Sequence, residues 1–215
     1  RIVMIGEKKL RQLGFSPQQI SSFKREFDAA IDRHAIARAS LGIGVPTEDS
    51  IVSDITPQSP SKADAAIGYP AVELTVLTES DQFSDLVASM LPKKIGAVSI
   101  QYKGLEKSRL IDSVFKGEYE LVSIVFEGTH HSLLFWSSFF TPGNSLTAFA
   151  KEIPDLKSLD PANPNDAPKI RTLIQTDGNW IGVLREHRVI LSQKGIEGLR
   201  FNPTGQASFD SLRSK

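Results

Sequence analysis

Residues 72–103 carry the pattern that most restricts the fold of this chain. Apolar and polar residues alternate over 72–77 and again over 98–103, which is the period of a half-buried strand. Between these segments, apolar residues recur at helical three- and four-residue steps: Phe83, Leu86, Val87, Met90 and Leu91. Ser80 is a candidate N-cap for this helix, and Pro92 marks its end. The pattern predicts a βαβ unit whose two parallel strands are joined by a right-handed crossover.

A second helix is predicted near the amino terminus, after a short strand at Ile2–Ile5. Ser16 is a candidate N-cap, Pro17 suits the first helical position, and Gln19 completes a capping box. An apolar stripe follows at helical spacing: Ile20, Phe23, Phe27, Ala30, Ile31 and His34. We therefore expect one long N-terminal helix that runs to about Ala39.

Two β-hairpins are predicted in the second half of the chain. The apolar segments 119–126 and 133–140 flank the polar sequence EGTHHS, and the segments 170–175 and 180–184 flank TDGN. With the βαβ unit, these elements predict an α/β or α+β fold. We expect a mixed β-sheet with a long N-terminal helix, one βαβ unit and two C-terminal β-hairpins.

The predicted domain organisation follows the composition. Residues 45–68 hold three prolines, many small polar residues and few large apolar ones, so we expect a loop or linker there. It separates an N-terminal helical segment, residues 1–44, from a mixed α/β domain, residues 69–215. We expect these two parts to form one compact unit.

Composition limits the class of protein. The 215 residues are 40% hydrophobic and 23% charged, which is ordinary for a soluble globular protein. No apolar run approaches the roughly 18 residues of a membrane-spanning helix, and the first residues lack the apolar core of a secretory signal. There is no cysteine, so disulfides and thiolate chemistry are excluded. These features predict a cytoplasmic protein with no membrane partner.

The adjacent residues His130 and His131 are the nearest approach to a chemical motif. In an extended segment, consecutive side chains point to opposite faces, so the two imidazoles would not converge on a metal ion. We interpret them as exposed residues at a hairpin tip. The chain also lacks a phosphate-binding glycine loop and a serine nucleophile elbow. We therefore expect no metal and no cofactor, and we favour a protein without catalytic activity.

An enzymatic alternative depends on the second strand of the βαβ unit. Gln101 and Lys103 share one face of that strand, and Glu73 lies upstream. An acid followed by a Gln-x-Lys strand is the minimal pattern of metal-dependent nucleases, so a nuclease or hydrolase built on these three residues is the alternative. The polar outer face of an amphipathic strand explains the same residues.

Charge and aromatic content favour recognition of a macromolecule. Residues 1–39 carry a net charge of +4, residues 40–92 carry −7, and residues 185–215 carry +3. We predict a non-catalytic protein-binding module, of the immunity, antitoxin-like, adaptor or accessory kind. Its predicted partner is another protein, bound through His130, His131, Trp136 and Trp180. A second alternative is nucleic-acid binding through the basic termini.

Overall fold

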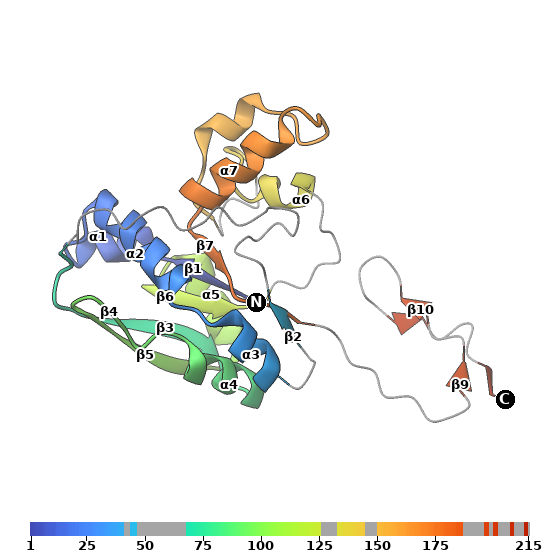
Figure 1. Cartoon of the computed structure of the whole chain (residues 1–215), viewed down its shortest axis with the longest axis horizontal. Coiled ribbons are helices and arrows are strands. Elements are labelled where there is room, and N and C mark those ends of the chain that lie inside the picture. Colours follow the sequence, from blue (N-terminus) through green and yellow to red (C-terminus); the bar gives the residue numbers. More distant parts are fainter. Residues whose placement is uncertain are drawn as a thin grey trace.

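The computed structural model shows one central sheet with helices on both sides (Figure 1). It describes residues 1–40, 68–125, 133–144 and 150–186, and the backbone of short strands at 44–46, 196–197, 200–201, 207–208 and 213–214. The short strands form three two-stranded pairs. These pair β2 (Gly44–Pro46) with β8 (Leu184–Glu186), β9 (Ile196–Glu197) with β12 (Arg213–Ser214), and β10 (Arg200–Phe201) with β11 (Ala207–Ser208).

The central sheet has six strands in the order β4-β5-β3-β6-β1-β7. Their bounds are β1 (Ile2–Ile5), β3 (Glu73–Glu79), β4 (Lys94–Ile95), β5 (Val98–Leu105), β6 (Leu121–Ile124) and β7 (Trp180–Gly182). Strand β3 is parallel to both β5 and β6, and the other pairings are antiparallel. The predicted mixed sheet, and with it the α/β or α+β class, is confirmed.

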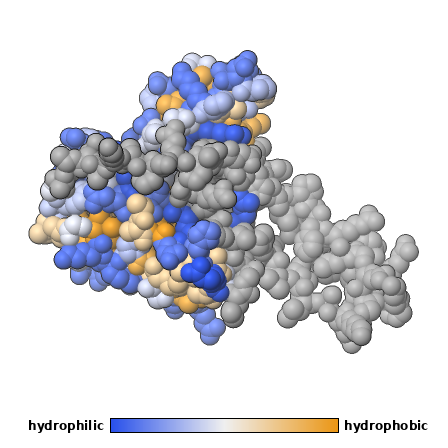
Figure 2. All heavy atoms as spheres, viewed as in Figure 1, coloured by the Kyte–Doolittle hydropathy of each residue, from blue (hydrophilic) through white to orange (hydrophobic). Residues whose placement is uncertain are grey.

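Two cores lie on opposite faces of this sheet. Because side chains alternate along a strand, Val3 and Ile5 of β1 face the first core, and Ile2 and Met4 face the second. The first core is covered by the helices α1 (Glu7–Gln12), α2 (Pro17–Ala29), α3 (Arg33–Ala39) and α4 (Gln82–Met90). The second is covered by α5 (Lys107–Lys116), α6 (Leu133–Ser138), the 3₁₀ helix η2 (Pro154–Ser158) and α7 (Ala167–Asp177). In Figure 2, hydrophobic residues are visible on the side of the molecule where α1 and α2 lie above the strands of the sheet.

The βαβ unit is confirmed. Residues 73–79 of β3 pair in parallel register with residues 99–105 of β5, and α4 lies between the two strands in sequence. The helix begins one residue later than predicted, because Asp81 is the N-cap in place of Ser80. A carboxylate is the stronger acceptor for the free amide groups of the first turn.

The N-terminal helix is two helices instead of one long one. Its predicted start is correct, because the capping box forms. The Ser16 hydroxyl accepts a hydrogen bond from the backbone amide of Gln19, and the Gln19 side-chain oxygen accepts one from the backbone amide of Ser16. The helix then ends at Ala29, and the Asp32 side chain caps α3 by accepting a 2.8 Å hydrogen bond from the Ala35 amide. An aspartate in this position offers the backbone a new N-cap, which competes with continuation of the helix.

Neither predicted C-terminal hairpin forms. Residues 133–138 are the helix α6, and residues 170–175 belong to α7. The run LLFWSSFF has no clear period, so its length and apolar character fit a buried helix as well as a strand. The sequence TDGN, interpreted as a hairpin turn, instead ends α7. The Gly178 amide donates to the Ile174 carbonyl, and a Cβ on Gly178 would lie 2.4 Å from that oxygen.

The predicted domain boundary at residues 45–68 stays a prediction. Most of the proposed linker 45–68 lies outside the described residues. The first core nevertheless contains side chains from both sides of it, including Phe23 and Phe27 from α2 and Leu74 and Val76 from β3. We retain the division into 1–44, 45–68 and 69–215 as a proposal.

Candidate functional site

The carboxyl ends of the parallel strands form the most distinctive edge of the sheet. Strand β3 leads into α4, which packs on the first core, whereas the chain after β6 leads to α6, which packs on the second core. The two neighbouring strands therefore send their connections to opposite faces and in opposite directions. In open α/β sheets, this switch in direction opens a crevice at the carboxyl ends of the strands, where ligands bind. We take the carboxyl ends of β3 and β6 as the candidate site.

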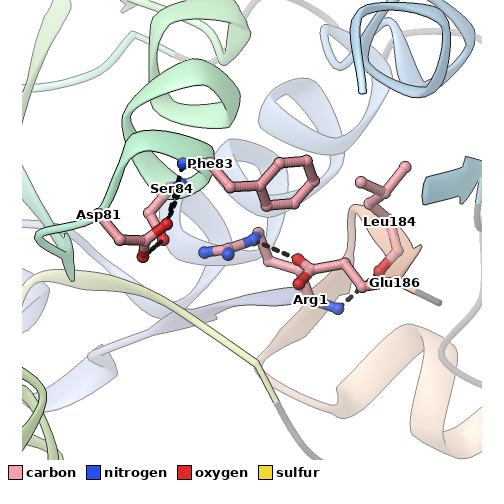
Figure 3. Close-up of polar contacts among 6 residues, drawn as sticks. All are labelled: Arg1, Asp81, Phe83, Ser84, Leu184 and Glu186. Carbon is pink, nitrogen blue, oxygen red and sulfur yellow. Dashed lines mark hydrogen bonds and ion pairs between the residues drawn. The ribbon is translucent and has the colours of Figure 1, made fainter. Parts of the chain in front are cut away.

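A buried arginine lies at this edge, just before β1. The Arg1 side chain is only 3% exposed, and its Nε donates a 2.7 Å hydrogen bond to the Glu186 carboxylate. The guanidinium carbon also lies 5.7 Å from the centre of the Phe83 ring. Figure 3 shows the guanidinium between the carboxylates of Asp81 and Glu186. Because its charge is compensated from two elements, the arginine is held in a fixed position.

Asp81 joins this cluster to the start of α4. Its Oδ1 accepts hydrogen bonds of 2.9 Å from the amides of Phe83 and Ser84, and its Oδ2 accepts from the Ser84 hydroxyl (Figure 3). Burial alone would raise the pKa of Asp81. The hydrogen bonds from Ser84 and Phe83 and the positive charge of Arg1 outweigh burial and hold that pKa below its usual 3.8. The carboxylate is therefore charged at any ordinary pH.

A buried hydroxyl without a partner belongs to the same edge. Thr78, the last residue but one of β3, is 2% exposed, and within the described part of the chain its Oγ1 makes no hydrogen bond. Leaving a buried hydroxyl unpaired costs about 1–3 kcal/mol, so such a group calls for an explanation. A ligand or a water molecule that donates to or accepts from Thr78 would supply one. Thr78 therefore offers a buried hydroxyl for hydrogen bonding at this edge.

The predicted partner-binding residues are placed in two different ways. Trp180 on β7 is 2% exposed, and its ring lies 6.2 Å from that of the half-buried Trp136 on α6. The structure thus brings both tryptophans together, in the interior of the second core and not on a fully exposed surface. His130 and His131 lie outside the described residues.

The three residues of the predicted nuclease site do not converge. Glu73, Gln101 and Lys103 are exposed on one face of β3 and β5, but Glu73 pairs with Ser99, four residues before Lys103. At about 3.3 Å per residue, this places Glu73 and Lys103 roughly 13 Å apart along the strands.

The same sheet face carries a hollow that the sequence did not predict. Gln101 and Lys103 line a hollow of about 410 Å³ together with Thr75, Leu77, Tyr102, Glu118, Tyr119 and Glu120. Within the described residues, no group of three or more histidine or acidic side chains is placed to hold a metal ion. None of the helices in the described ranges is long and apolar enough to cross a bilayer.

Comparisons with known proteins found solved structures of similar fold. No family model matches the chain, and no curated protein does. Several solved structures are similar. Haemophilus influenzae OppA in complex with the peptide RPPGFSPFR has a TM-score of 0.70 at 15% identity, over 99% of this chain and 47% of that one. The Escherichia coli murein tripeptide-binding protein MppA has a TM-score of 0.69 at 14% identity, with the same coverage. Staphylococcus aureus NikA in complex with Ni(L-His)₂ has a TM-score of 0.61 at 13% identity, over 95% and 48%.

This likeness shows the fold, and the chain spans about half the length of the solved structures it matches. It corrects three predictions. The protein-binding module of the immunity, antitoxin-like, adaptor or accessory kind is wrong, as are the nuclease or hydrolase and nucleic-acid-binding alternatives, because the similar structures bind peptides or metal chelates. A protein or nucleic-acid partner is wrong for the same reason. The cytoplasmic location is wrong because a similar structure, that of MppA, is described as periplasmic.

Few features of the sequence could have predicted this site. Arg1 and Glu186 stand 185 residues apart and share no motif. Asp81 belongs to no motif, and the N-cap predicted at this point of the chain was Ser80. The one usable signal was the βαβ pattern itself, because the carboxyl ends of parallel strands are where such folds bind ligands.

Proposed function

We propose that this chain is a ligand-binding part of a solute-binding protein. We propose that this protein binds short peptides and acts outside the cytoplasm. The observation that carries the proposal is the likeness of nearly the whole chain to the peptide complex of OppA, with a TM-score of 0.70. Peptide-binding proteins recur among the similar structures, including MppA and a dipeptide-binding protein in complex with Met-Leu. A peptide is therefore the ligand class that the comparisons favour most.

The candidate site fits this role chemically. A peptide offers carbonyl acceptors and amide donors along its length, and the carboxyl edge presents the Thr78 hydroxyl, the Arg1 guanidinium and the Asp81 carboxylate. Buried polar groups that are left unpaired without ligand select strongly for a ligand that pairs them. The fixed charges of Arg1 and Asp81 keep the edge organised before the ligand arrives.

The chain covers about half of each similar structure, and this affects how it would hold a ligand. Periplasmic binding proteins close around their ligands by a hinge motion of two domains. MppA has been solved in what is described as an unliganded open form, and this chain covers 47% of it. We infer that the chain provides one wall of the ligand site and that the other wall lies on a second domain. A single wall binds weakly, so the assay must detect millimolar affinity.

The test is equilibrium dialysis of the chain against a mixture of tripeptides, with mass spectrometry of the retained peptides. We expect enrichment of peptides in the protein compartment, and less enrichment for Thr78→Val, which removes the unpaired hydroxyl and keeps the shape of the side chain. The matched control is Thr176→Val on the exposed surface of α7, where the hydroxyl only bonds the Thr172 carbonyl within the helix. A retained fraction equal to that of a protein of unrelated fold would refute the proposal.

A further inference from the structure

The hollow on the sheet face between β5 and β6 is separate from the candidate peptide site. Its residue Thr75 and the site residue Thr78 both belong to β3, but they stand on opposite faces of the sheet because they are three positions apart. The hollow also lies toward the amino ends of β3 and β6, whereas the candidate site lies at their carboxyl ends. An inference about the hollow therefore does not depend on the proposed function.

The floor of the hollow is formed by residues that the alignment of β3 with β5 and β6 brings side by side. Thr75 pairs with Gln101 in the strand register. The side-chain amide of Gln101 donates a 3.2 Å hydrogen bond to the Thr75 hydroxyl. On the other side of Thr75, β6 has not yet begun. There the Glu120 carboxylate takes the place of a strand carbonyl and accepts a 2.8 Å hydrogen bond from the Thr75 amide. Glu120, Thr75 and Gln101 thus form one polar row across the sheet.

Opposite charges face this hollow without meeting. Lys103 lies one row further along β5, beside Leu77. Lys103 and Glu120 lie on opposite sides of β3, two strand spacings apart, and are offset by two residues along the strands. Their Cα atoms are therefore about 12 Å apart. Glu118, which follows the C-cap of α5, adds a second carboxylate to the lining. Among the described residues, no ion pair joins Lys103 to either glutamate.

The size and lining of the hollow define a ligand class. Its volume of about 410 Å³ is at the lower end of the range for small-molecule sites. One ammonium group stands on one side and two carboxylates stand on the other, with an amide and a hydroxyl between them. A molecule that carries both a cationic and an anionic group would satisfy both ends at once, whereas a simple anion would meet the two glutamates.

We propose that this hollow binds a small zwitterion of amino-acid size. Its ammonium group is held by Glu118 and Glu120, and its carboxylate is held by Lys103. The Gln101 side chain lies between the two charged ends and offers a hydrogen bond to the middle of the ligand.

The test uses ω-amino acids of increasing length as rulers, from glycine to 6-aminohexanoate, titrated into the ¹⁵N-labelled chain. We expect amide shifts confined to Thr75, Gln101, Lys103 and their neighbours, with an affinity that rises to one matched length. N-acetylated probes lack the cation and should produce no such shifts. Affinity should also fall as salt is raised, because the contacts are between exposed charges.

Two variants identify the charged groups. Lys103→Gln and Glu118→Gln should each weaken binding about two- to fivefold, which is the range for exposed ion pairs. Lys107→Gln, on α5 and outside the lining, is the matched control and should change nothing. Unchanged affinity in Lys103→Gln, or equal shifts with the N-acetylated probes, would overturn the proposal and leave a hydrated surface depression. Shifts at 78–84 would instead report the peptide site, so the two proposals fail separately.

Discussion

Lys24 gives the sharpest prediction about stability. This residue of α2 donates hydrogen bonds to two carbonyls at the end of α7, at 2.8 Å to Gln175 and also to Gly178. The contacts tie the helix layer of the first core to that of the second, past the edge strand β7. Burial of the ammonium lowers the pKa of Lys24 from 10.5 to about 8, with the Asp28 carboxylate acting in the opposite direction.

The lowered pKa sets the direction and the size of the effect. Between pH 8 and pH 10.5 the unfolded chain binds a proton at Lys24 that the folded chain has released, so stability rises with pH in this window. At about 1.4 kcal/mol for each pKa unit, the penalty for burying the charged form falls by about 2 kcal/mol between pH 8 and pH 10. Lys24→Met has no such contribution. The stability of wild type relative to Lys24→Met should therefore improve by about 2 kcal/mol over this interval.

The assay is urea unfolding of both proteins at pH 7, 8, 9 and 10. Subtracting the variant removes the contributions of all other titrating groups. Lys8→Met, at an exposed position on α1, is the matched control and should give a difference from wild type that does not change with pH. A pH-independent difference for Lys24→Met would refute the assignment of a buried ammonium between α2 and α7.

Three further predictions concern the framework of the fold. Asn179→Ala should lower the free energy of unfolding by about 2–4 kcal/mol in urea titrations, because this buried amide bonds the backbone of β1 and of Lys151. Gly178→Ala should cost about 2 kcal/mol or more in calorimetry, since the new Cβ would lie 2.4 Å from the Ile174 carbonyl oxygen, and a melting temperature equal to wild type would contradict this. Asp81→Asn should cost about 0.3–1 kcal/mol at neutral pH, because the amide keeps the cap but loses the negative charge beside the helix N-terminus and Arg1. Because the pKa of Asp81 is lowered by folding, that cost is complete above pH 3.8 and should disappear as the pH falls through the folded pKa, which unfolding curves at pH 7, 4 and 2 would show.

The parts of the fold that sequence predicts are those with a clear period. Residues 72–77 and 98–103 alternate, and the helix between them has a 3.6-residue stripe, so the βαβ unit was readable. Residues 133–140 are apolar at almost every position and have no period, so α6 was predicted as a strand. Asp32 lies within the segment predicted as one long helix, whereas in the structure it is the N-cap of a second helix, α3.

The candidate site was beyond sequence reasoning for a different reason. Arg1, Asp81 and Glu186 come from three distant segments that only the sheet order brings together. Glu118 and Glu120 were not predicted to accompany Lys103, because that requires knowing that β6 lies on the far side of β3. Trp136 and Trp180 were predicted to bind a protein partner, whereas their rings meet in the interior of the second core.

The proposed function requires the carboxyl edge of the sheet to bind a peptide. The most direct test is titration of the ¹⁵N-labelled chain with a tripeptide, followed by amide chemical shifts, which detect millimolar binding. We expect saturable shifts at 78–84 and at Ile124, and a weaker affinity in Thr78→Val with the same residues affected. Saturable shifts confined to other parts of the chain, or none at peptide concentrations of several millimolar, would contradict it.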